Sequence, residues 1–301
     1  MNILEVNRVD KRFGSRDVLK GLSFSVPEHT IYGFIGENGA GKTTTMKLIL
    51  GLLPLDGGEI RVCGEQVRYG QTKTNRHIGY LPDVPEFYGY LTPVEYLALS
   101  GSIAGMHPDE LKARTAELLS LVGLEQSASR RINGFSRGMK QRLGIAQALI
   151  HRPRLLVCDE PTSALDPAGR KDVIDVLKAI KHQTTVLFST HILSDVERIC
   201  DEIGLLHGGS MRLEGKLEEI RQMHAGSGYA IEFQDEADAA RFLIAHPGGE
   251  LASSTRLLFA SGTQEEMSRA MGALASMGIC PVKIELCEPS LESLFLEAAG
   301  L

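Results

Sequence analysis

Residues 36–43 have the residue types and the spacing of a phosphate-binding site. The segment reads Gly36-x-x-x-x-Gly41-Lys42-Thr43, and it lies between the apolar run 31–35 and a helical segment that begins at Lys42. Glycines permit positive φ and let backbone N–H groups approach an anion closely. Those N–H groups, the helix N-terminus and the lysine ammonium attract phosphate, while the threonine hydroxyl can ligate magnesium. A glycine-rich turn is the plain alternative, and the strand before and helix after make it the weaker one.

A second set of reactive side chains follows the apolar run 155–158. Asp159 and Glu160 stand at the C-terminal end of this predicted strand, which is where open α/β sheets bind their ligands. Hydrolysis of a phosphoanhydride needs neutralised charge, a metal ion and a positioned water. We therefore predict that Asp159 and Thr43 hold magnesium and that Glu160 orients or deprotonates the water. Because side chains alternate along a strand, the two acids should point in different directions and have different roles. The alternative to a functional role is that the two acids belong to a helix cap or a surface turn.

The composition limits the class of protein. The 301 residues are 43% hydrophobic, which is enough for a full core, and the formal charge of −6 argues against a protein that coats nucleic acid. The longest strongly apolar stretch, 48–55, is broken by Gly51 and Pro54, so we predict no membrane span. The start of the chain does not resemble a signal peptide, and we expect a cytoplasmic protein. Reduced thiols are expected for the scattered residues Cys63, Cys158, Cys200, Cys280 and Cys287.

The order of predicted elements indicates an α/β fold with a mostly parallel sheet and helices on both faces. Strands are expected at 3–9, 18–26, 31–35, 59–63, 77–81, 155–158, 185–189, 202–206 and 210–214. Those near the N-terminus form a small antiparallel region, and Gly208-Gly209 predicts a hairpin. Helices that begin at Pro93, at Pro108 and near Arg137 predict an inserted helical lobe at about 84–152. A further helix is expected at 168–180.

A second, smaller domain is predicted after a linker-like segment at 225–228. We place the two domains at 1–224 and 225–301. The smaller one is predicted to be α+β, with strands at 229–233, 256–260 and 282–286, helices at 237–246 and 264–277, and a last amphipathic helix at 291–299.

Over residues 1–220 the motifs resemble, in order and spacing, those of an ATP-binding-cassette (ABC) ATPase. The matching segments are 36–44, 134–142, 155–162, 163–166 and 189–191. The tail around Pro289-Ser290-Leu291-Glu292 is similar to the end of the bacterial ATPase subunits that serve drug, antimicrobial-peptide, sodium and polysaccharide exporters. The resemblance implies an ATP-hydrolysing subunit that uses ATP and Mg2+, forms a head-to-tail homodimer and drives a separately encoded membrane permease, with export as the expected direction. It would lie peripherally on the inner face of the cell membrane, with no nucleic-acid partner.

The resemblance also implies roles for individual residues. Catalytic roles fall to Glu160, His191 and Lys42, and metal binding to Thr43, Asp159 and Asp83. Nucleotide contacts are implied for Phe13, Gly36, Asn38, Gly39, Ala40, Gly41, Lys42, Thr43, Thr44, Asp83, Ser136, Gly138 and Asp166. Phe13 stands where the family usually stacks a tyrosine on adenine, although the sequence alone leaves a plain core role equally open. Ser136, Gly138 and Asp166 would act across the dimer interface.

Two positions depart from the family pattern. The signature segment reads Phe-Ser-Arg-Gly-Met, so that Arg137 adds a charge, and Asp83 stands where a glutamine is usual. An aspartate can ligate magnesium but donates no hydrogen bond when ionised. We predict a permease contact around 83–91, where Phe87, Tyr88, Tyr90 and Leu91 supply aromatic and apolar surface, with packing inside the lobe as the alternative.

Two other functions were weighed. A soluble ABC ATPase that acts on ribosomes or DNA usually carries two cassettes, or long coiled-coil or zinc-binding insertions, and this sequence has neither. A nucleotide-binding regulator without turnover would lack Glu160 or Lys42, and both are present.

Overall fold

The computed structural model describes residues 1–71, 73–223, 228–259, 263–286, 291 and 294–295. The chain forms two compact units, Met1–Leu217 and Glu218–Leu301, and each is described by itself. The domain boundary predicted at 224/225 lies outside the described residues.

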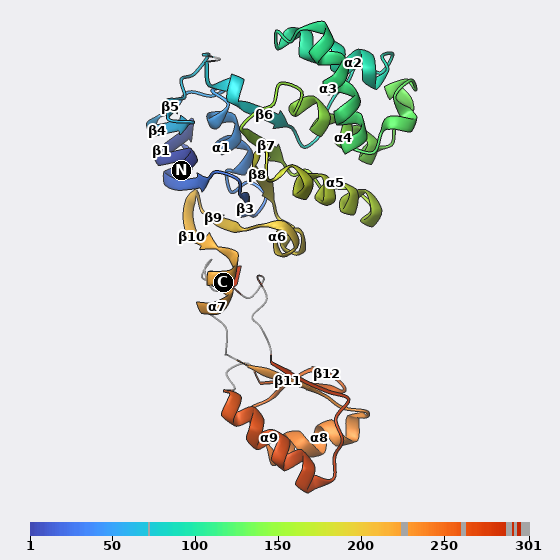
Figure 1. The fold of residues 1–301 in the computed structure, drawn as a ribbon. Coiled ribbons are helices and arrows are strands. Elements are labelled where there is room, and N and C mark those ends of the chain that lie inside the picture. The colour runs from blue at the N-terminus through green and yellow to red at the C-terminus, as the bar shows by residue number, and fades with distance from the viewer. Residues whose placement is uncertain (72, 224–227, 260–262, 287–290, 292–293, 296–301) are drawn as a thin grey trace. The chain divides into compact units, whose positions relative to one another are not determined.

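A six-stranded sheet forms the centre of the first unit, in the order β10-β9-β3-β8-β7-β6 (Figure 1). Its strands are β3 (Ile31–Gly36), β6 (Ile78–Leu81), β7 (Leu155–Asp159), β8 (Thr185–Thr190), β9 (Glu202–His207) and β10 (Ser210–Lys216). All neighbours are parallel except the β9–β10 hairpin, which confirms the mostly parallel sheet. Every residue of β3, β7 and β8 is buried, because both faces of the sheet are covered.

An antiparallel sheet with the order β2-β1-β4-β5 confirms the second predicted β region. It comprises β1 (Asn2–Phe13), β2 (Arg16–Pro27), β4 (Gly57–Val62) and β5 (Glu65–Gln66). Helix α1 (Lys42–Ile49) packs between the two sheets, where Met46 and Ile49 join one apolar cluster with Val6 of β1 and Val157 of β7.

Helices cover both faces of the parallel sheet. Tyr32 and Phe34 of β3 face the cluster around α1. Gly33 points the other way, where a Cβ atom would lie 2.7 Å from Cys200 Sγ and 3.4 Å from Val196 Cγ1, so that only glycine lets the segment of α6 (Leu193–Ile199) approach this closely. Helix α5 (Pro167–Ile180) packs beside α6.

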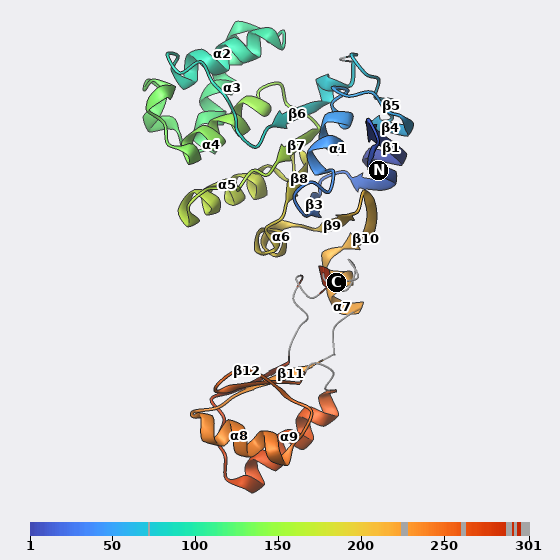
Figure 2. The same cartoon turned by 180° about the vertical axis from the view of Figure 1, so that it is seen from behind.

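The predicted helical lobe is present. It contains α2 (Pro93–Ile103), α3 (Pro108–Leu121) and α4 (Arg137–Ala148), and it lies on the side of the parallel sheet away from β1 and β4 (Figures 1 and 2). A proline occupies the first turn of α2 and of α3, as the sequence predicted, and Thr92 and Glu95 form a capping box at α2. Short 3-10 helices lie at η1 (Lys73–His77), η2 (Glu125–Ser127) and η3 (Ile132–Gly134).

The second unit is a split β-α-β-β-α-β arrangement. Its antiparallel sheet has the order β12-β13-β11-β14, and α8 and α9 lie together on one face of it (Figure 1). The elements are β11 (Tyr229–Glu232), α8 (Glu236–Ala245), β12 (Glu250–Ser253), β13 (Arg256–Phe259), α9 (Gln264–Met277) and β14 (Lys283–Leu286), and α7 (Leu217–Met223) precedes them. The sequence missed β12, because all four of its residues are exposed and give no apolar alternation. Most of the predicted helix 291–299 lies outside the described residues.

The cysteines are thiols as far as the structure describes them. Cys63, Cys158, Cys200 and Cys280 form no disulfide, and Cys287 lies outside the described residues.

Candidate nucleotide site

A cavity of about 390 Å³ lies between the loop that follows β3 and the C-terminal ends of β6 and β7. Its lining residues are Phe13, Arg16, Val18, Glu37, Asn38, Gly39, Gly41, Lys42, Thr43, Thr44, Asp83, Asp159 and Glu160. Ten of these thirteen were predicted site residues; the sequence missed Arg16, Val18 and Glu37. The fold thus joins the phosphate loop to the acids at 159 and 160 at one edge of the parallel sheet.

The phosphate loop is shaped by its glycines. Gly41 has φ of 114° and caps the N-terminus of α1, and a Cβ atom there would lie 2.7 Å from Leu19 Cδ2. A Cβ atom at Gly36 would lie 2.7 Å from the Leu206 carbonyl oxygen. Glycine is therefore required at both ends of the loop, which leaves the N-terminus of α1 open to the cavity.

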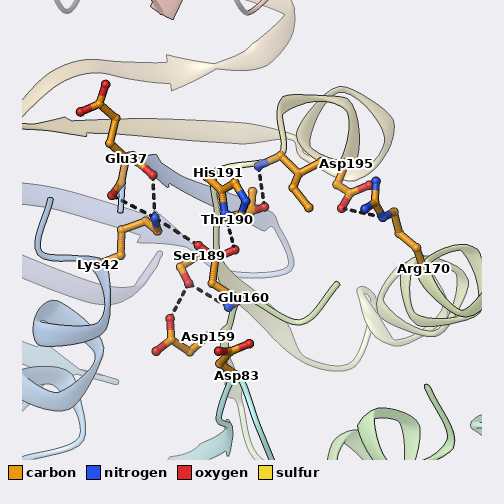
Figure 3. A network of polar contacts seen from close by, with 12 residues as sticks. Glu37, Lys42, Asp83, Asp159, Glu160, Arg170, Ser189, Thr190, His191 and Asp195 are labelled. Atoms are coloured by element: carbon orange, nitrogen blue, oxygen red, sulfur yellow. Dashed lines mark hydrogen bonds and ion pairs between the residues drawn. The ribbon is translucent and has the colours of Figure 1, made fainter. Parts of the chain in front are cut away.

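Lys42 is buried and points into the loop. Its ammonium donates hydrogen bonds to the carbonyl oxygens of Gly36 at 2.6 Å and Glu37 at 3.2 Å. It also lies 3.1 Å from Glu160 Oε1, although that oxygen accepts no hydrogen bond of good geometry, so the contact is chiefly electrostatic. Figure 3 shows the ammonium between the loop carbonyls and the acid.

Glu160 occupies a strained backbone position and connects two predicted catalytic residues. Its φ is 47°, a left-handed value that is uncommon for a non-glycine residue and that is often found at functional sites. Its Oε1 faces Lys42, while its Oε2 lies 3.0 Å from His191 Nδ1 (Figure 3). Glu160 therefore contacts both of the other residues predicted to be catalytic.

Asp159 points to the other side of the strand end, as alternation predicted. Its side chain is 3% exposed, and its Oδ1 accepts a 2.7 Å hydrogen bond from Ser189 Oγ. The same Oγ accepts a 3.0 Å hydrogen bond from the Glu160 N–H. Ser189 thus orients both acids (Figure 3). Sequence reasoning gave Ser189 no role of its own; the signal was a serine at the end of an apolar strand, and the pairing of Ser189 with Asp159 across β7 and β8 becomes visible only in the sheet register.

Phe13 stands at the rim of the cavity. Its residue is 48% exposed, which excludes the core role that the sequence left open, and the ammonium of Lys11 lies 5.3 Å from its ring centroid. An exposed ring backed by a cation is suited to stacking on a planar base.

Asp83 lines the cavity from the segment after β6. Burial raises the pKa of the Asp83 carboxyl, Arg137 lowers it, and the negative charges of Asp159 and Glu160 raise it further, with a raised pKa as the net result. Arg137 Nη2 lies 4.0 Å from Asp83 Oδ1.

Six predicted residues do not line this cavity: Gly36, Ala40, His191, Ser136, Gly138 and Asp166. Gly36 and Ala40 belong to the loop itself, and His191 contacts Glu160. Ser136 caps α4 by accepting a hydrogen bond from the Met139 N–H at 3.3 Å, and Asp166 caps α5 by accepting one from the Gly169 N–H, also at 3.3 Å. A Cβ atom at Gly138 would lie 3.7 Å from the Gly169 Cα atom, so the first turns of α4 and α5 are neighbours. Ser136, Gly138 and Asp166 therefore lie close together, outside the cavity lining.

The donors at the cavity fit a magnesium ion. Asp159 is a buried carboxylate, and the described part of the chain places no cationic side chain in an ion pair with it. A buried carboxylate requires a compensating cation. The Thr43 hydroxyl and the Asp159 carboxylate are the hard oxygen donors that Mg2+ prefers, and phosphate oxygens and waters usually complete such a site.

The comparisons with known proteins agree with this geometry. Residues 19–163 match the family model described as "ABC transporter". The chain is 33% identical over 311 residues to the bacitracin transport ATP-binding protein BcrA of Bacillus licheniformis, a match that covers 99% of this chain and 97% of that protein. It is 33% identical over 258 residues to the Nod factor export ATP-binding protein I of Ralstonia nicotianae, covering 85% of this chain and 80% of that protein. A dimeric ATP-binding cassette, solved in a post-hydrolysis state with ADP and Pi, is similar with a TM-score of 0.63 and 26% identity over 71% of this chain and 98% of its own.

The fold and the cavity define a phosphate-loop nucleotide hydrolase. The chain belongs to the family of ABC transporter ATP-binding proteins. It is an ATP-binding subunit with ATPase activity, and the relatives favour a transporter over the alternative function on ribosomes or DNA. Within the described residues, no helix has the length and apolar character that a bilayer crossing requires.

Proposed function

We propose that ATP binds with its phosphates on the loop 36–43 and its adenine on Phe13. The buried, uncompensated Asp159 carboxylate beside the loop carries the proposal, because it calls for a cation where phosphate oxygens would lie. Thr43 and Asp159 would hold Mg2+, with Asp83 within the same cavity as a further oxygen donor. When bound, Mg2+ supplies Lewis-acid neutralisation of the phosphate charge.

The chain's own residues then have distinct tasks. Lys42 exchanges its contact with Glu160 for phosphate oxygens. Glu160 accepts a proton from the attacking water or orients it, and His191, in contact with Glu160, faces the terminal phosphate. Ser189 holds the Asp159 carboxylate and the backbone N–H of Glu160 through one hydroxyl.

The second surface is proposed to complete the site of another copy of the chain. Ser136 and the N–H groups at the start of α4 would form an anion site outside the lining of the first cavity, and Asp166 and Gly138 flank it. A head-to-tail homodimer would place this surface on the partner's nucleotide. The dimeric structure of the similar cassette supports the dimer.

We infer a membrane permease as the other partner, with the chain on the inner face of the cell membrane and export as the direction. The predicted contact segment 83–91 is partly exposed: Tyr88 is 56% and Tyr90 66% exposed, whereas Phe87 packs edge-on against Tyr96. Beside it lies a groove of about 440 Å³ that includes Gln141, whose buried Nε2 makes no hydrogen bond. The groove lining combines apolar residues with the charged residues Glu86, Arg137 and Lys140, and an unpaired buried amide within it is suited to a backbone carbonyl of an inserted helix.

Lys42→Ala tests the nucleotide site. We expect loss of ATP binding and hydrolysis, while Lys47→Ala, an exposed lysine of the same helix, behaves as the wild type. Equal ATP binding by the two variants would overturn the proposed site.

Capture of the Glu160→Gln protein from native membranes with Mg-ATP tests the partner. We expect a stoichiometric multi-span membrane protein. Recovery of ribosomes or nucleic acid without such a protein would instead support the alternative function.

Asp83→Gln tests the role of Asp83 in coupling to the permease. We expect this variant to retain ATP binding while its partner-stimulated turnover changes.

A further inference from the structure

The two departures from the family pattern meet in the folded chain. Asp83 follows β6 and Arg137 opens α4, and the fold brings Asp83 Oδ1 within 4.0 Å of Arg137 Nη2. Each residue by itself is electrostatically unfavourable. Arg137 places a cation at the N-terminus of α4, where the helix dipole disfavours positive charge. Asp83 adds a carboxylate to a cavity that already holds those of Asp159 and Glu160. The two residues carry opposite charges, so each offsets the electrostatic cost of the other.

Asp83 needs such compensation. Its Oδ1 is shielded from solvent and accepts no hydrogen bond. The charged groups that act on it are Arg137, Asp159, Glu160 and His191, of which Arg137 has the strongest favourable effect on the ionised carboxylate. Without Arg137, three carboxylates would share one cavity edge with Lys42 as the nearby buried cation.

The ion pair also joins two surfaces. Asp83 lines the nucleotide cavity, whereas Arg137 lines the neighbouring groove together with Phe87, Lys140 and Gln141. A Mg2+ ion bound between Thr43 and Asp159 would attract the Asp83 carboxylate and so compete with Arg137 for it. Binding of Mg2+ in the cavity would therefore weaken the ion pair of Arg137, a side chain that lines the groove.

We propose that Arg137 is a positioning residue for Asp83: it holds the carboxylate on the α4 side of the cavity and yields it when Mg-ATP binds. This inference rests on the proposed nucleotide site. The Asp83–Arg137 pair then sets the Mg2+ concentration at which nucleotide binding is half-saturated. When the ion pair breaks, the Arg137 guanidinium becomes free on the groove side, where the permease is proposed to dock.

A double-mutant cycle tests the pair through the Mg2+ dependence of nucleotide binding. The probe is a fluorescent, non-hydrolysable ATP analogue, titrated with Mg2+ in the wild type, Arg137→Ala, Asp83→Asn and the double variant. Both side chains are about half exposed, and pairs of this kind are weak. We therefore expect Arg137→Ala to lower the half-saturating Mg2+ concentration by about two- to fivefold, and to have no effect in the Asp83→Asn background.

Two further variants separate positioning from general effects. Arg137→Lys should restore most of the wild-type Mg2+ requirement, because it keeps the charge. Lys140→Ala removes a cation from the same groove without touching Asp83 and should leave the requirement unchanged. Equal effects of Arg137→Ala in both backgrounds, or the same shift in Lys140→Ala, would overturn the pair. A wild type that binds no nucleotide at any Mg2+ concentration would instead overturn the proposed site itself.

Discussion

Lys42 and Glu160 face each other across the nucleotide cavity, with 3.1 Å between Nζ and Oε1. The pair holds the proposed phosphate-binding cation next to the proposed base. Lys42 has carbonyl partners besides Glu160, and Glu160 has His191. Each residue can therefore leave the pair without losing all of its contacts, which suits a site whose charges rearrange when ATP binds.

Glu160→Gln should separate binding from hydrolysis. Lys42 keeps its contacts with the Gly36 and Glu37 carbonyl oxygens, so ATP affinity is expected to persist, while turnover falls by about 10²- to 10⁴-fold through loss of the base. Phosphate release at saturating Mg-ATP and equilibrium ATP binding measure the two quantities. Glu59→Gln, a change in the antiparallel sheet at a residue that does not line the cavity, is the control. Normal turnover in Glu160→Gln would remove Glu160 from the catalytic role.

Ser189→Ala should weaken magnesium binding more than nucleotide binding. Ser189 Oγ is the hydrogen-bond partner of Asp159 Oδ1 and of the Glu160 N–H, so its loss frees both acids. Groups that orient metal ligands typically change metal affinity by about 10- to 100-fold. The check is the Mg2+ concentration at half-maximal ATPase rate. Thr185→Val, at the other end of β8, also deletes a buried hydroxyl, and a matching shift there would count against the orienting role.

Phe13→Ala should weaken ATP binding without destabilising the fold. The Phe13 ring is exposed at the cavity rim and stacks on no other ring of the described chain. Stacking of a base on an aromatic ring contributes about 1–3 kcal/mol, so ATP affinity should fall by about 5- to 100-fold. Phe13→Tyr should bind as the wild type does. Calorimetry with ATP and with inorganic triphosphate distinguishes a loss of base stacking from a general loss of phosphate binding. Triphosphate binding should be unaffected by either change, because triphosphate has no base.

Asp83→Asn should raise the thermal stability of the nucleotide-free protein at neutral pH. A carboxyl whose pKa is raised on folding destabilises the folded state when it is ionised. This cost sets in as the pH rises above the ordinary value of 3.8 and is complete above the raised pKa. The variant removes that cost, and Tm is expected to rise by about 1 °C, since solvent screens the half-exposed group. The gain should shrink as the pH is lowered through the raised pKa.

Asp175→Asn provides a control of opposite sign. A hydrogen bond from Lys171 holds the pKa of the Asp175 carboxyl below its ordinary value, so its stabilising effect is present at neutral pH and persists until the pH falls through that lowered pKa. The variant should lower Tm throughout the range in which the gain of Asp83→Asn disappears. Parallel pH profiles for the two variants would contradict the assignment for Asp83.

The sequence alone predicted the strands of the parallel sheet, the helices of the lobe and the residues of the phosphate loop, but it missed β5 and α6. Buried parallel strands are continuous apolar runs, and the glycines at 36 and 41 are needed locally, so both features are visible without tertiary information. The same locality explains the failure at β12: its exposed residues pair through backbone hydrogen bonds, which carry no side-chain pattern.

Only the tertiary structure decided which distant residues act together. The register of β7 against β8 places Ser189 beside Asp159, and the packing of α4 against β6 brings Arg137 to Asp83. Such contacts depend on strand order and helix packing, which the chain specifies through its whole core and not through any short segment. The exposure of Phe13 was likewise undecidable from its neighbours in sequence, because the cavity that it borders is made by other strands.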